Sequence, residues 1–136
     1  MRRLFLIGAA MYTACVGCRL TTALAAVHAQ LSPAIIGPLM AVFALMPLLF
    51  AVRGGKVIDR LGVRKPMMAG ALLVVAGSAI AGLFPQAPTF VLAAACIGLG
   101  NMAFHLGMQH SAGEMATNPE ERTANFNLLT LSLIHI

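Results

Sequence analysis

Four long apolar runs, separated by short polar segments, make up most of the chain. Asp, Glu, Lys and Arg are absent from residues 20–52 and again from residues 66–113. An α-helix rises 1.5 Å per residue, so about twenty apolar residues cross the hydrocarbon core of a bilayer. The pattern therefore predicts membrane-spanning helices over residues 4–27, 33–52, 66–84 and 89–113. A fifth apolar segment begins near residue 124 and stops before it is long enough to span.

Prolines and small residues indicate how these spans bend and pack. Pro38 and Pro47 lie inside the second span, where proline tends to kink a helix. Small residues recur four apart in the third and fourth spans, a spacing that lets helix backbones approach closely in lipid. These pairs are Gly77 with Ala81, Ala94 with Gly98, and Ala103 with Gly107. The alternative is that Ala and Gly are simply common in membrane helices.

The two ends of the chain allow other interpretations. Arg2 and Arg3 precede an apolar run, and residues 23–25 resemble a cleavage site, which is also the pattern of a signal peptide. The length of the run and the spans that follow favour a membrane helix. Residues 131–136 match a translation of a transposon-end adapter used in sequencing-library preparation, so we expect them to be an artefact rather than native sequence. The alternative is the start of a native fifth helix.

Composition supports a polytopic membrane protein. Hydrophobic residues make up 60% of the 136 residues and charged residues 10%, which leaves too few polar side chains to cover a soluble domain. Cys15 and Cys18 form a C-x-x-C inside an apolar run without a second ligand pair, so we predict no metal and no cofactor. Without a His, Asp and Glu cluster or an activated nucleophile, the sequence does not predict an enzyme.

The basic residues predict the orientation of the chain. The net charge is +5, yet the basic residues stand at the ends of apolar runs with few aromatic residues among them, so we predict no nucleic-acid partner. Loops rich in Lys and Arg stay in the cytoplasm. With Arg2, Arg3, Arg122 and the segment 53–65 on that side, the outer turns carry no Lys or Arg. We therefore expect an integral protein of the plasma (cytoplasmic) membrane, with the lipid bilayer as partner and the N-terminus in the cytoplasm.

The segment 53–65 holds five of the nine Lys and Arg residues and the one Asp. We predict that it is a loop between the second and third spans, in which Gly55 and Gly62 permit tight turns. The simplest role for Asp59 is a local ion pair with Arg60 or Arg64, which in an exposed position stabilises by under about 1 kcal/mol.

The same segment resembles the signature loop of the major facilitator superfamily of transporters. The matching pattern is Gly55-x-x-x-Asp59-Arg60-x-Gly62-x-Arg64-Lys65, with Val63 where many members have Arg. Residues 32–37 and 119–122 resemble members of the family more weakly. The resemblance implies an all-α membrane protein that supplies four helices and the start of a fifth to an N-terminal six-helix bundle. It also implies secondary active transport of small solutes by alternating access, with the C-terminal half of the same protein missing.

On this resemblance the chain is an N-terminal fragment that transports nothing alone. The alternative is a complete small four-helix membrane protein with a structural or accessory role. In the family, the Asp of this loop caps a helix of the opposite half and latches one of the alternating states. That implies a conformational latch in this chain, formed by Gly55, Asp59, Arg60, Gly62, Arg64 and Lys65.

Arg19 is the charged residue nearest the middle of a span. It lies about 22 Å along the first helix from Leu4, within or just at the outer edge of the hydrocarbon core. Ionisable residues at such depths usually face the bundle interior and serve a pathway. A mildly polar face joins Arg19 to Tyr12, Cys15, Thr22 and Ala26. We expect Arg19 to attract an anionic substrate or to pair with an acid in the missing part; the alternative is snorkelling to the headgroups.

The fourth span carries a second polar face. The residues that share it are Asn101, His105, Met108, Gln109 and Ala112. His105 falls in the middle of the membrane and could couple transport to a proton, because histidine changes charge near neutral pH. A neutral His105 that forms a hydrogen bond with a neighbouring helix is the alternative. The predicted pathway therefore comprises Arg19, Tyr12, Asn101, His105 and Gln109, for a substrate that the sequence does not identify.

Overall fold

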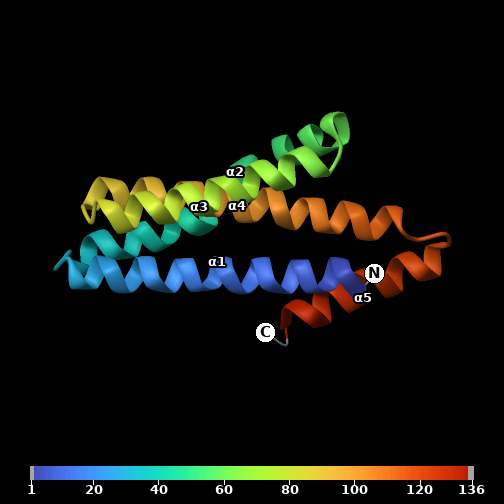
Figure 1. Cartoon of the computed structure of the whole chain (residues 1–136), viewed down its shortest axis with the longest axis horizontal. Helices are drawn as coiled ribbons and strands as arrows, with labels where there is room; N and C mark the ends of the chain where they lie inside the picture. Colours follow the sequence, from blue (N-terminus) through green and yellow to red (C-terminus); the bar gives the residue numbers. More distant parts are fainter. Residues whose placement is uncertain (1, 135–136) are drawn as a thin grey trace.

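The structure, a computed structural model, describes residues 2–134, which form helices joined by short connections (Figure 1). In chain order the helices are α1 (Arg2–His28), α2 (Pro33–Leu61), α3 (Arg64–Leu83), α4 (Ala87–Glu114) and α5 (Pro119–Ile134). Side chains of residues 2–5, 129 and 132–134 lie outside the description, as do residues 1, 135 and 136. The predictions for the side chains of Arg2 and Arg3, and for residues 132–136 of the expected artefact, therefore lie outside the described residues.

Four helices, α1 to α4, are long and apolar enough to cross a membrane. Their large apolar side chains point away from the bundle: Leu48 is 75% exposed, Leu72 68% and Leu83 72%. A water-soluble protein rarely exposes so much contiguous apolar surface, whereas lipid solvates it without cost. The prediction of an all-α membrane protein with four spans is confirmed.

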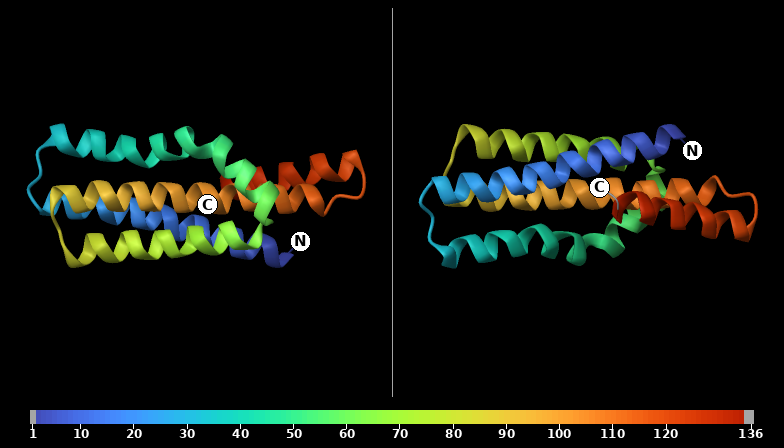
Figure 2. Two further views of the ribbon diagram at one scale, coloured as in Figure 1. Left: turned by 90° about the horizontal axis from the view of Figure 1, so that it is seen from above. Right: turned by 90° about the horizontal axis from the view of Figure 1, so that it is seen from below.

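Helix α4 lies at the centre of the bundle and packs against each of the other four helices. Figure 2 shows it between α2 and α3, with α1 along a further side. Its buried positions are mostly small, which brings the neighbouring backbones close. A core forms where α4 meets α1, α2 and α3; its buried members are Ala26, Leu39, Phe43, Ala81, Phe90, Ala93, Ala94 and Ile97.

Helices α3 and α4 approach most closely at glycines. A Cβ atom on Gly70 would lie 2.7 Å from the carbonyl oxygen of Gly100, and one on Gly77 would lie 2.9 Å from the Cβ of Cys96. On another side of α4, a Cβ on Gly98 would lie 3.0 Å from the carbonyl oxygen of Phe43. Close packing through Gly77 and Gly98, as the small-residue spacing predicts, is therefore present in the structure.

The structure corrects the prediction of a loop over residues 53–65, because most of this segment belongs to helix α2. It continues to Leu61, so the connection to α3 is only Gly62 and Val63. Gly62 has φ +74°, which only glycine adopts readily, so the tight turn predicted there is confirmed. Gly55 is helical instead, and the turn predicted for it is wrong. Figure 2 shows that α2 is bent and that its later part crosses α4 before it meets α3. Pro38 and Pro47 lie inside this helix.

The two ends of the bundle differ in charge. At one end, the charged end, α2 and α4 finish, α3 and α5 begin, and α1 starts (Figure 1). The connections at the other end, residues 29–32 and 84–86, contain no Asp, Glu, Lys or Arg. Helix α5 begins at Pro119 rather than near residue 124. Proline suits a first helical turn, and Glu120 and Glu121 interact favourably with the helix dipole there.

Candidate functional site

A pocket between α1, α2 and α4 lies within the spanning part of the bundle, and we call it the membrane pocket. Its volume is about 100 Å³. The lining residues are Tyr12, Cys15, Val16, Arg19, Phe43, Ile97, Gly98 and Asn101. It therefore brings together three residues that the sequence analysis assigned to a pathway, from two helices far apart in the chain.

Arg19 lines this pocket from α1. Its guanidinium carbon lies 5.8 Å from the centroid of the Phe43 ring, a distance typical of a cation–π contact. Cys15, Thr22 and Ala26 on the same face of α1 are buried. The Thr22 hydroxyl is kept within its own helix, since it donates to the carbonyl of Cys18 at 2.6 Å. Arg19 itself is exposed in this chain, so its position in the bundle interior rather than among the headgroups stays a prediction.

Proline chemistry adds a hydrogen-bond acceptor beside the pocket. Pro47 has no N–H, so the carbonyl of Phe43, four residues earlier, has no helical donor. That carbonyl lies against Gly98, where the missing side chain lets α2 and α4 approach. Sequence reasoning missed Phe43; its position four residues before Pro47 is the signal that could have indicated a freed carbonyl.

The membrane pocket combines groups of complementary chemistry. The Arg19 guanidinium supplies fixed positive charge and several donors, while Asn101 supplies a donor and an acceptor. The Phe43 ring and the side chains of Val16 and Ile97 supply apolar wall beside these groups. The other two predicted pathway residues lie elsewhere: Gln109 lines a second pocket, and His105, half-buried, lines neither.

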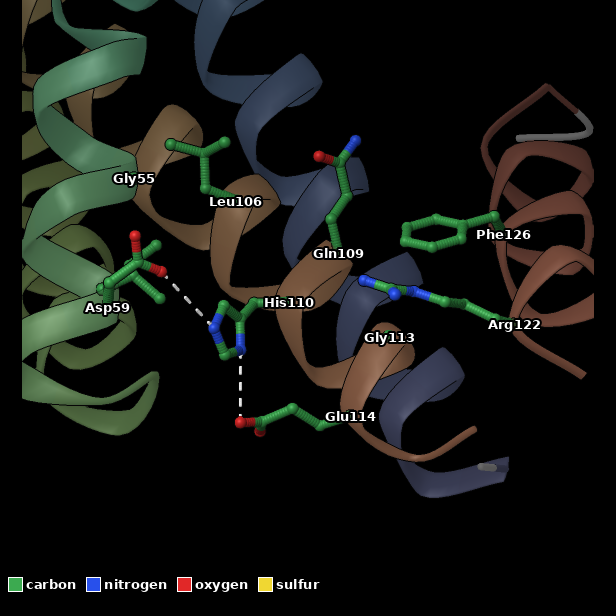
Figure 3. A pocket seen from close by; sticks show the side chains of 10 residues that line it. Gly55, Asp59, Leu106, Gln109, His110, Gly113, Glu114, Arg122 and Phe126 are labelled. Atoms are coloured by element: carbon green, nitrogen blue, oxygen red, sulfur yellow. Dashed lines mark ion pairs between the residues drawn. The ribbon is translucent and has the colours of Figure 1, made fainter. Parts of the chain in front are cut away.

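The second pocket lies at the charged end, between α2, α4 and α5, and we call it the end pocket (Figure 3). Its volume is about 380 Å³. The residues that line it are Gly55, Ile58, Asp59, Leu106, Gln109, His110, Gly113, Glu114, Arg122 and Phe126. Two residues of the predicted latch, Gly55 and Asp59, therefore share a cavity with the end of α4.

Asp59 contacts α4 rather than its own segment. Its carboxylate lies 3.6 Å from Nε2 of His110, and the Nδ1 atom of the same ring lies 3.6 Å from the carboxylate of Glu114. Figure 3 shows these two contacts leaving different edges of the ring. The local pair expected with Arg60 or Arg64 is wrong, because α2 stays helical and directs Asp59 toward α4. His110 was predicted only to be interfacial.

The remaining latch residues do not join this contact. Arg60, Arg64 and Lys65 are exposed, and within the described part of the chain none of them forms an ion pair. Residues 2–134 contain no cluster of three or more His, Cys, Asp or Glu side chains that could hold a metal ion.

Helix α5 closes the far side of the end pocket. The Arg122 guanidinium lies over Gly113, where an added Cβ would be 3.5 Å from it. Asn125 is buried, and its side-chain amide donates to the carbonyl of Ala112 at 3.2 Å. Ahead of the helix, the Thr117 N–H donates to the Glu121 carboxylate at 3.0 Å. These contacts attach the start of α5 to the end of α4.

Comparison with known proteins agrees with this architecture. No curated protein and no solved structure matches the chain. The family model described as Major Facilitator Superfamily matches residues 4–133, which is nearly the whole chain. The matched range contains all four spanning helices, the turn at Gly62 and both pockets. The chain belongs to the major facilitator superfamily of transporters.

Proposed function

We propose that the chain forms part of the N-terminal half of a secondary active transporter that moves a small anionic solute by alternating access. The observation that supports this most directly is Arg19 in the membrane pocket, a fixed positive charge at membrane depth beside polar groups of α1 and α4. A charge in that position is costly unless a partner compensates it. An anionic solute supplies the compensation when it binds.

Alternating access also requires a contact that closes one side of the transporter. We assign this role to the charged end, whose concentration of basic residues favours the cytoplasmic side of the membrane. Asp59 stands at the end of α2 with its side chain 68% exposed, so its carboxylate is available to a helix of the other half. A carboxylate at a helix N-terminus stabilises it by up to about 2 kcal/mol when partly buried.

The experiment for this proposal uses the complete transporter in proteoliposomes, with radiolabelled organic anions, cations and neutral sugars as candidate solutes. We expect anion uptake that Arg19→Gln reduces at least about tenfold, since the charge contact between Arg19 and the anion is lost. Arg19→Lys retains the charge and should retain part of the uptake.

Arg53→Gln is the matched control for this experiment. The Arg53 guanidinium lies 5.9 Å from the Phe50 ring, so it makes a similar cation–π contact outside the membrane pocket. Its loss should leave anion uptake unchanged. Uptake of cations alone, or equal losses in Arg19→Gln and Arg53→Gln, would show that Arg19 does not recognise the solute.

A further inference from the structure

We propose that His110 is a proton-binding site that fastens the last turns of α2 to α4, so that protonation from the aqueous phase at the charged end holds Asp59 in place. The proposal stands on the position of one imidazole ring between two carboxylates. The proton site itself does not depend on the proposed function, but its effect on the Asp59 latch does.

Both nitrogens of the His110 ring face a carboxylate. Nε2 lies 3.6 Å from Asp59 on α2, and Nδ1 lies 3.6 Å from Glu114 one turn further along α4. A neutral imidazole has one N–H, so one of its nitrogens must then direct a lone pair toward a carboxylate oxygen. The protonated ring has two N–H groups and can donate to both. The geometry therefore suits the imidazolium form.

The Nδ1 atom is buried and has no hydrogen-bond partner within the usual limit. An N–H at this position would therefore have the Glu114 carboxylate, 3.6 Å away, as its acceptor. Histidine ordinarily gains and loses that proton between pH 5 and 8.

The charged groups around His110 can be named for each neighbouring helix. Among the residues that line the end pocket, α2 contributes Asp59, α4 contributes Glu114 and α5 contributes Arg122. Figure 3 shows the Arg122 side chain on the side of α4 away from Asp59, close to Gly113. The two carboxylates are the charged groups that form ion pairs with the His110 ring, whereas Lys56 and Arg60 of α2 and Arg64 and Lys65 of α3, at the same end, are exposed.

Protonation of His110 would couple to the position of α2. Asp59 lies on the last turns of α2, which cross α4 at this point (Figure 2). When His110 is charged, it holds the Asp59 carboxylate on α4. When His110 is neutral, that attraction is lost and Asp59 is free to reach the helix that the proposed latch requires. Acid at the charged end thus opposes latching.

Amide hydrogen exchange tests the proton site directly in this chain, purified in lipid nanodiscs. Exchange in residues 55–61 is compared between the unmodified chain and His110→Gln at about pH 5.5 and about pH 8, where histidine is mostly charged and mostly neutral. Comparison of variants at one pH cancels the intrinsic pH dependence of exchange. We expect exchange about threefold slower in the unmodified chain at the lower pH and no difference at the higher pH.

Two further variants make the result specific. Asp59→Asn should remove the difference as His110→Gln does, and the double variant should exchange no faster than either single variant, because the two residues act through one contact. His28→Gln removes an exposed histidine at the opposite end of the bundle and should match the unmodified chain. Circular dichroism establishes that each variant is folded.

Three outcomes would overturn the proposal: a difference of equal size at both pH values, a pH-dependent difference that persists in Asp59→Asn, or no difference at either pH. The measurement involves no transport. Its failure would therefore leave the proposed transport function intact, and failure of anion uptake would leave the proton site intact.

Discussion

Gly70 offers a sharp test of how α3 and α4 are held together. A Cβ atom added there would lie 2.7 Å from the Gly100 carbonyl oxygen and 3.1 Å from the Cβ of Ala103. Ordinary contact begins near 3.4 Å, so the Gly70→Ala substitution requires α3 and α4 to separate locally by up to about 0.7 Å. The opposing atom is backbone, which cannot move aside as a flexible side chain does.

The size of the effect follows from two opposing terms. Overpacking of this kind costs about 1–3 kcal/mol. Replacing glycine with alanine inside a helix stabilises by about 1 kcal/mol, so the net change from Gly70→Ala alone would understate the clash. Gly17→Ala separates the terms, since Gly17 is also inside a helix and an added Cβ there meets nothing within 4 Å. The difference between the two variants should therefore be about 1–3 kcal/mol.

The assay is equilibrium unfolding of the purified chain in mixed detergent micelles, with SDS as denaturant and circular dichroism as readout. Gly70→Ala should unfold at a lower SDS fraction than the unmodified chain, while Gly17→Ala should unfold at an equal or higher fraction. Equal stability of the two variants would refute the close packing of α3 on α4 at Gly70, and with it the central position of α4.

Two other predictions concern the charged end. Gly62→Ala should destabilise the chain by about 1–3 kcal/mol in the same assay, because φ +74° and ψ 171° belong to a region that only glycine occupies readily; Gly55→Ala, helical and open to solvent, should not. In the complete transporter, Asp59→Asn should shift the population toward the state open at the charged end and slow uptake. Cysteine-labelling rates on the two sides of the membrane measure this shift, and unchanged labelling and uptake would remove Asp59 from the latch.

The number and order of the spanning helices could be predicted from the sequence, because the length of each apolar run directly reflects the thickness of a bilayer. The end of α2 could not. Two consecutive glycines and five basic residues suggest a loop, yet Gly54 packs against Met102 and Leu106, and Ile58 is 2% exposed. Tertiary packing against α4 keeps the segment helical where local preference alone would not.

The candidate sites also combine features that follow from spacing along one helix with features that depend on how the helices pack. Helical periodicity grouped Arg19 with Cys15 and Thr22 on one face of α1, because that grouping depends only on spacing along one helix. Its contact with Phe43 depends on how α1 and α2 lie across α4, which the sequence does not encode locally. His110 was likewise predicted only to be interfacial, and its position beside Asp59 depends on where α2 crosses α4.

A single continuous helix connects the two pockets, with mechanical consequences. Phe43 in the membrane pocket and Asp59 in the end pocket are sixteen residues apart on α2, about 24 Å along its axis. Pro47 lies between them, where the backbone lacks a hydrogen bond and is most easily bent. Any swing of the Asp59 end must either be absorbed at Pro47 or move the Phe43 ring against Arg19. The stiffness of the helix between Phe43 and Pro47 therefore decides whether movement of the last turns of α2 is transmitted to the membrane pocket or stays confined to the charged end.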